Sequence, residues 1–187
     1  DGSDDSNVAT ATIAITPEDD CPEGYDCAGE CGGSAVNCPN WQDNPGAYVF
    51  ISTISGSIVS DVNGMQMGEC NEISPSNGMC LDESQDIFAA FDSVGMVRGI
   101  ATMLYPPFGP NQGTPIYEMQ MRSDTAGEIL YFKYYDASED AILDIIETYA
   151  FVINDNLGDI NVPLLFNISC PGSDNIIDFC GICDGDN

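Results

Sequence analysis

Carboxylates are the most abundant chemically active groups of this chain. Its 187 residues contain 31 Asp plus Glu, three Lys plus Arg and no His. Two carboxylates flanking a glycosidic bond can act as acid and nucleophile. With this many acids, however, close pairs arise by chance, and no pair lies in a stretch of sequence that indicates a cleft. The lack of His excludes Ser-His-Asp and Cys-His catalysis and the usual zinc and non-haem iron ligand sets. We therefore expect a protein that is not an enzyme.

Carboxylate and carbonyl oxygens are the ligands that calcium prefers. The expected calcium ligands lie in two segments rich in Cys, Gly and Asp: Asp26 and Glu30 in the first, and Asp184, Asp186 and Asn187 in the second. For Asp184, Asp186 and Asn187 the alternative is that they are solvated loop residues. Zinc is disfavoured, because Cys180-Gly-Ile-Cys183 runs on into Asp-Gly-Asp-Asn, a flank that zinc-binding pairs lack.

Nine cysteines favour an oxidising, extracellular setting, because disulfides rarely persist in the cytosol. They are Cys21, Cys27, Cys31, Cys38, Cys70, Cys80, Cys170, Cys180 and Cys183. We expect a Cys70–Cys80 disulfide across a loop rich in Gly, Asn and Ser, contributing about 2 to 3 kcal/mol in the chain-entropy model. We expect few free thiols. Since the count is odd, either one thiol is free or its partner lies beyond residue 187.

The formal charge of -28 argues against nucleic acid and anionic membranes as partners, since the chain cannot neutralise several phosphates. No run approaches the roughly 20 apolar residues of a membrane span, and no basic region opens the chain. We therefore expect a mature, exported polypeptide or a piece of one. Arg98, Arg122 and Lys133 are the only cations. Because Arg98 has apolar neighbours, we expect a carboxylate, first of all Asp86, to hold it at the margin of the core; the alternative is an exposed Arg at a strand edge.

Two features suggest contact with sugars. Asn167-Ile-Ser169 is the one Asn-x-Ser/Thr acceptor, and its neighbours Leu164, Phe166 and Ile168 share the opposite face of a strand, so a glycan on Asn167 would stand in solvent. Trp41, Tyr131, Tyr134 and Tyr135 offer a sugar-stacking platform. The alternative is stronger, because aromatic residues at alternating strand positions are usually core or cross-strand pairs.

The chain divides into four parts: an extended strand in residues 1–20, Cys-rich connectors in 21–40 and 170–187, and a β-sandwich in 41–169. Residues 8–15 alternate strictly. One face carries Ala9, Ala11, Ile13 and Ile15, and the other carries Thr10 and Thr12, which would be free to bear O-glycans. We expect the first face to complete the sandwich of a neighbouring subunit; the alternative is that this strand folds back into its own domain or belongs to a preceding sandwich.

Seven strands are expected in the central part, at residues 47–60, 86–91, 94–104, 116–122, 128–135, 148–153 and 163–168. Turn signals separate them, and this spacing favours a mainly β fold, an antiparallel, Ig-like β-sandwich. Residues 137–149 are open between helix and strand. Their apolar residues recur at helical spacing behind Ser138, which is a suitable N-cap.

Two resemblances bear on the function. The stretches Asp26-Cys-Ala-Gly-Glu-Cys-Gly-Gly-Ser-Ala-Val36 and Phe179-Cys-Gly-Ile-Cys-Asp-Gly-Asp-Asn187 resemble the thrombospondin type 3-like, calcium-associated repeats of secreted surface proteins. Such repeats imply disulfides and calcium in place of a hydrophobic core. The stretches 86–91, 97–101 and 127–140 are similar to a β-sandwich repeat of large secreted bacterial surface and adhesin-like proteins. This second resemblance implies a turn and a strand after Asp140, and no catalytic role.

These features predict a structural repeat subunit of an extracellular filament, adhesin or matrix-like glycoprotein, located outside the cell or on its surface. Its partners would be copies of itself, joined head to tail by donor-strand addition, and glycans; membrane insertion is not expected. The main alternative is a carbohydrate-binding module on the same kind of stalk. A secreted hydrolase is the third possibility and would require a buried carboxylate pair in a cleft.

Overall fold

A computed structural model of the protein describes residues 24, 26, 27, 31–68 and 86–170. Apart from one 3-10 turn, the regular structure of this part is entirely strand. The elements are η1 (Pro45–Ala47), β1 (Phe50–Ser60), β2 (Ile87–Phe91), β3 (Val97–Leu104), β4 (Ile116–Ser123), β5 (Ile129–Asp136), β6 (Ala141–Ala150), β7 (Asn156–Leu157) and β8 (Leu164–Asn167). The predicted mainly β, largely antiparallel fold is confirmed. No helix in the described residues is long and apolar enough to cross a membrane.

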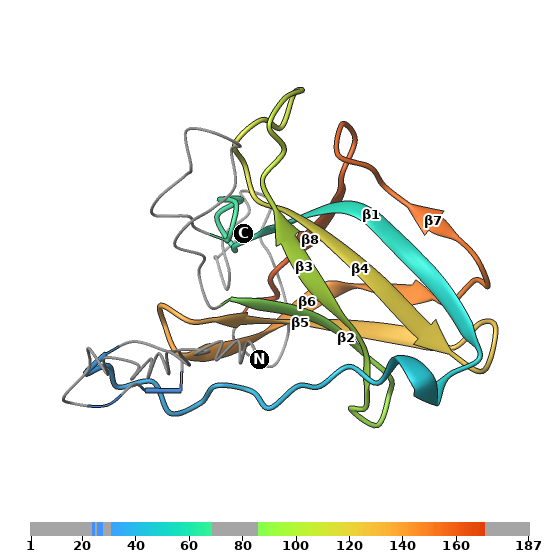
Figure 1. Ribbon diagram of the computed structural model, residues 1–187, viewed down its shortest axis with the longest axis horizontal. Helices are drawn as coiled ribbons and strands as arrows, with labels where there is room; N and C mark the ends of the chain where they lie inside the picture. The colour runs from blue at the N-terminus through green and yellow to red at the C-terminus, as the bar shows by residue number, and fades with distance from the viewer. Residues whose placement is uncertain (1–23, 25, 28–30, 69–85, 171–187) are drawn as a thin grey trace, which may run out of the picture.

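The strands form one curled sheet in the order β6-β5-β2-β3-β4-β1-β7, with β8 also paired to β1. Neighbours are antiparallel, except that β7 and β8 both run parallel to β1. The sheet curls into a nearly closed, sandwich-like barrel (Figure 1). At its seam, Ile145 of β6 and Ile168 beyond β8 form a single bridge, and the Ser169 amide donates to the Asp144 carbonyl at 2.7 Å.

Inward-facing aromatic side chains hold the two sides of the barrel together. Phe88 of β2, Phe132 of β5 and Phe166 of β8 contact one another, with ring centroids 4.7 to 5.7 Å apart. Burial of such rings is the dominant favourable contribution to a core of this kind. The alternating pattern of the strands therefore places its apolar side in the barrel interior.

Residues 137–149 belong to a turn and a strand. The Asp136 carboxylate accepts hydrogen bonds from the amides of Ser138 and Glu139, and Asp140 has a φ of +49°, so the chain turns sharply before it enters β6. The helical alternative is thereby excluded. The strand expected at 148–153 ends at Ala150, because the chain turns back at Asn154, which has a φ of +58°.

The segment after β6 is a turn in the sequence-based prediction, yet it contains the short strand β7. Thr53 and Ile54 of β1 pair with Asn156 and Leu157. Between β7 and β8 the loop passes close to a bulge in β1, where a Cβ atom on Gly56 would collide with the carbonyl carbon of Asp159. The absence of a side chain at this position therefore lets β7 and β8 occupy the same edge of β1.

Candidate interaction surface

Residues 31–49, which we call the strap, lie against the outer side of the sheet. Figure 1 shows them as a blue to cyan segment that runs past β2 to η1. The strap contacts the barrel at both ends and in the middle: Asn37 binds Asp140, Trp41 packs on Phe91, and the Val49 amide donates to Asp124 at 2.8 Å. The outer sides of β2 and of part of β5 are thereby covered.

Asp140 fastens the first end of the strap. Its carboxylate accepts hydrogen bonds from the amides of Val36 and Asn37 at 2.9 and 3.0 Å and from the Tyr135 hydroxyl at 3.0 Å. The Val36 amide is the largest of several causes that hold the pKa of Asp140 below its usual range. The carboxylate is therefore ionised at neutral pH, when it binds these donors most strongly.

A disulfide between Cys27 and Cys38 lies beside this contact. The Tyr135 hydroxyl lies 3.0 Å from Cys38 Sγ, and burial together with the Asp140 carboxylate raises the pKa of Tyr135 to about 12. All four cysteines of the described residues are disulfide-bonded; the other two are Cys31 and Cys170. The remaining cysteines, Cys21, Cys70, Cys80, Cys180 and Cys183, lie outside the described residues, and so does the predicted Cys70–Cys80 disulfide.

The sulfurs of Cys27 and Cys38 and a carboxylate oxygen of Asp140 lie within 4.8 Å of one another. This group does not suit a metal ion, because the sulfurs are joined to each other and the carboxylate faces N–H and O–H donors. Among the predicted calcium ligands the structure describes Asp26, which accepts a hydrogen bond from the Ala35 amide at 2.9 Å. Glu30, Asp184, Asp186 and Asn187 lie outside the described residues.

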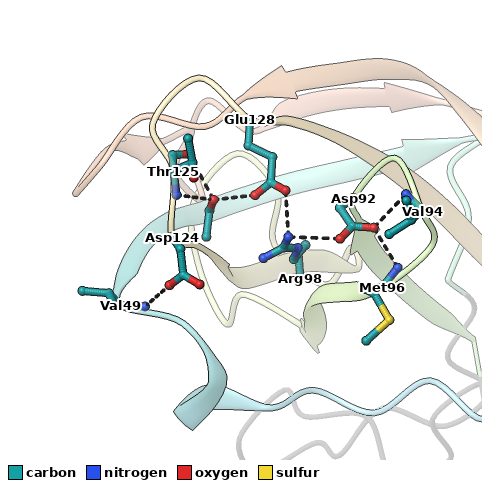
Figure 2. Close-up of polar contacts among 9 residues, drawn as sticks. Val49, Asp92, Val94, Met96, Arg98, Asp124, Thr125 and Glu128 are labelled. Atoms are coloured by element: carbon teal, nitrogen blue, oxygen red, sulfur yellow. Dashed lines mark hydrogen bonds and ion pairs between the residues drawn. The ribbon is translucent and has the colours of Figure 1, made fainter.

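Arg98 forms a buried ion-pair network under the other end of the strap (Figure 2). Its Nη2 atom donates to Asp92 at 3.0 Å and to Glu128 at 2.7 Å. The ring of Tyr48 lies 4.2 Å from its guanidinium carbon. Such a planar cation binds carboxylates and stacks on aromatic rings at the same time. Arg98 is therefore held by carboxylates, as predicted, rather than exposed.

The predicted partner of Arg98 was wrong. Asp86 instead accepts hydrogen bonds from the Tyr134 hydroxyl and the Ala137 amide, both at 2.8 Å. The reason is the antiparallel register: Val97 pairs with Phe91 at the end of β2, so Arg98 lies next to the hairpin that begins at Asp92. Asp86 precedes β2 and lies at the opposite end of this pair of strands.

Asp92 also opens a hairpin loop that occurs twice in the chain. Residues 92–96 read Asp-Ser-Val-Gly-Met and residues 61–65 read Asp-Val-Asn-Gly-Met. In each, the first carboxylate accepts amides two and four positions later, and the Gly has a positive φ. Burial alone would raise the pKa of both carboxyls, but these hydrogen bonds outweigh it and lower them. Sequence reasoning identified turn signals between the strands but missed this repeated five-residue pattern.

Every side-chain cation of the protein forms an ion pair within the described residues. Arg98 binds Asp92 and Glu128, Arg122 binds Asp43, and Lys133 binds Asp144. The two arginine side chains are 11% and 7% exposed, whereas Lys133 is 37% exposed. Lys133 therefore supplies most of the positive charge that a partner in solution can reach.

Lys133 lies on a part of the sheet that the strap leaves exposed, which we call the bare face. Its large apolar and charged side chains are Ile129, Tyr131 and Lys133 on β5 and Ile142, Asp144 and Ile146 on β6, and the smaller Thr148 and Ala150 of β6 lie on the same side. Lys133 and Asp144 are directly opposite in register. The four large apolar members are each 41 to 46% exposed, so they form the apolar surroundings of a neutral ion pair.

Three of the four aromatic residues that could have formed a sugar-stacking platform are instead packed against other side chains. Tyr134 is fully buried, with its hydroxyl 2.9 Å from that of Tyr117, and Tyr135 is buried under the strap. Trp41 packs edge-on against Phe91, with ring centroids 5.0 Å apart. Tyr131 alone is exposed. These aromatic side chains therefore pack in the core or against neighbouring strands, as is usual for aromatic residues in strands.

Asn167 lies on the side of β8 opposite to the buried Phe166 and Ile168. Its side-chain amide donates to one carboxylate oxygen of Glu147 at 2.7 Å and its backbone amide donates to the other at 2.8 Å. The expected O-glycan positions Thr10 and Thr12 lie outside the described residues, as does the assembly strand with Ala9, Ala11, Ile13 and Ile15.

The chain matches no protein-family model, no curated protein and no solved structure. The function must therefore be argued from the geometry of the strap, the seam and the bare face.

Proposed function

We propose that this protein is a non-enzymatic structural subunit of an extracellular filament, adhesin or matrix-like glycoprotein, assembled head to tail. The observation that carries the proposal is the incomplete closure of the barrel. The strand order begins at β6 and ends at β7, and among the described residues β6 and β8 share a single bridge. A sheet edge with unpaired backbone groups is a template for an incoming strand.

The chemistry of the seam supports strand addition. The Asn167 amide donates to the side chain of Glu147 instead of to a strand backbone. Beside it, Leu165 of β8 is 62% exposed. An added strand such as residues 8–15 of another copy would supply backbone partners and, through Ile13 and Ile15, apolar cover. Because the donor and the acceptor are different surfaces, this contact generates an open chain of subunits.

The rest of the molecule favours a structural role over a catalytic one. The buried charges of Arg98, Arg122 and Asp92 are used in internal ion pairs, and the disulfide at Cys27–Cys38 suits an oxidising location outside the cell. Calcium bound by the acidic connectors would relieve the repulsion between subunits of charge -28. An N-glycan on Asn167 is proposed as well, and would need Glu147 to release its side-chain amide.

Electron microscopy of three forms of the full chain tests this proposal. The unaltered protein should form filaments. Ile13→Asp should abolish them, because it puts a charge on the face that needs apolar cover, whereas Thr12→Ser on the opposite face should leave them intact. Filaments from the Ile13→Asp protein would disprove strand addition by this segment, and a monomeric unaltered protein would disprove the filament itself.

A further inference from the structure

We propose that the bare face binds the bare face of a second copy around a two-fold axis, so that subunits also associate side by side. This contact uses the outer side of β5 and β6, not the seam, and does not depend on strand addition.

The apolar content of the bare face is the first argument. Ile129, Tyr131, Ile142 and Ile146 are each 41 to 46% exposed and lie on two adjacent strands. Elsewhere on the same sheet the strap covers outward-facing residues such as Phe91, which is 4% exposed. Exposed apolar side chains gathered on one side of a sheet, in an otherwise acidic protein, mark an interaction site.

Charge identifies a second copy as the occupant. Two molecules of charge -28 repel each other on approach. On the bare face this repulsion is reduced, because Asp144 is paired with the one substantially exposed side-chain cation, Lys133. A strongly cationic partner would instead be attracted to the acidic surroundings. The bare face therefore suits a partner whose own contact surface is apolar and neutral, and a second bare face has that composition.

The arrangement is also self-complementary. Lys133 and Asp144 are directly opposite each other on neighbouring strands. A two-fold rotation about an axis near this pair brings Lys133 of each copy to Asp144 of the other, so two ion pairs exchange partners without leaving an unpaired charge. The apolar residues on either side then cover their counterparts, as an isologous contact requires.

Charge exchange between two variants tests the contact. All proteins carry Ile13→Asp, so strand addition cannot contribute, and sedimentation velocity measures self-association. The parent should form dimers. Lys133→Glu and Asp144→Lys each place like charges opposite each other in a homodimer, so we expect the dimer Kd to rise roughly 100-fold in either variant alone. An equimolar mixture should dimerise again. In the mixed dimer the introduced acid of one variant faces the introduced lysine of the other, and the unaltered Asp144 of the first faces the unaltered Lys133 of the second.

The outcomes are decisive in both directions. Recovery in the mixture supports the two-fold contact, since a role in stability alone would not restore association between two different variants. A monomeric parent, or a mixture no better than its components, overturns it and leaves the bare face to a different partner. Phe108→Asp is the matched control: this exposed aromatic on the β3–β4 loop should leave the Kd unchanged. Circular dichroism checks that each variant is folded.

Discussion

The covered and the bare parts of the outer sheet surface differ although their strands are neighbours. Phe91 of β2 and Tyr131 of β5 are directly opposite in register and both point outward. Phe91 is 4% exposed because Trp41 of the strap packs on it, whereas Tyr131 is 43% exposed. Two adjacent aromatic side chains on one sheet thus have opposite environments. The alternation along a strand determines which side of the sheet a side chain points to. Whether that side chain is exposed to solvent depends on a separate segment of the chain, here the strap.

Ion pairs differ between the two parts in the same way. Under the strap, Arg98 lies between Asp92 and Glu128 with the ring of Tyr48 over it. On the bare face, Lys133 and Asp144 remain accessible. Burial makes the first network sensitive to the loss of one partner, because an unpaired buried charge is costly. The second pair is expected to contribute little to folding.

The largest expected effect comes from removing a positive charge under the strap, and its control is the removal of a positive charge from the bare face. Arg98→Met leaves two carboxylates without a cation, which should cost about 3 kcal/mol and lower the Tm by roughly 6 to 12 °C. Lys133→Met alters the net charge equally but should change stability by less than about 0.5 kcal/mol. Thermal unfolding at low protein concentration measures both. Equal shifts would show that the strap does not shield Arg98 from solvent.

A more local effect, confined to the strap, is expected from opening it. Replacing both Cys27 and Cys38 by Ser removes a cross-link between positions 11 residues apart, worth about 3 kcal/mol in the chain-entropy model. We expect hydrogen exchange at Val36 and Asn37 to become up to roughly 100-fold faster, while β1 to β4 keep their protection. Ser34→Ala, an exposed change in the same segment, is the control. Unchanged exchange in the strap would mean that the disulfide does not contribute to holding this end of it.

Acidification should have the smallest effect of the three changes. It should loosen the strap and leave the barrel unaffected. The pKa of Asp140 is lowered in the folded protein, so its contribution is complete above the unfolded value of about 4 and is lost as the pH falls below it. Hydrogen exchange of the strap should therefore accelerate relative to the barrel when the pH is taken from above about 4 to below the lowered pKa of Asp140. Asp140→Asn, which tolerates the positive φ, should abolish this step. A strap equally protected at both pH values would contradict the role of Asp140.

Sequence reasoning predicted most of the strands because their alternation records which side faces the core. Five of the seven expected strands overlap β1 to β5 closely, and β8 lies inside its expected range. The sequence could not distinguish helix from strand in residues 137–149. Ile142 and Ile146 lie on the exposed bare face, and together with the inward-facing apolar residues they give a spacing that resembles a helix. β7 was missed because its two residues pair with β1 only through tertiary contact.

The interaction surface was harder to predict than the fold. The strap is attached by contacts such as Val36 to Asp140, which are 104 residues apart, and no local pattern reports such a pairing. Arg98 was expected to need a carboxylate, but choosing Asp92 over Asp86 requires the strand register. The repeated Asp-x-x-Gly-Met loops at 61–65 and 92–96 are the one signal that the sequence did contain.

The parallel pairing of β1 with β8 has a consequence for how the protein folds. β1 is the first strand of the described barrel and β8 the last, so the sheet cannot close until nearly the whole domain is available. Contacts between such distant segments slow folding. Under the extracellular role that we propose, a chain exported in an unfolded form would benefit from this delay, because the barrel would be completed only after β8 had followed β1 out of the cell.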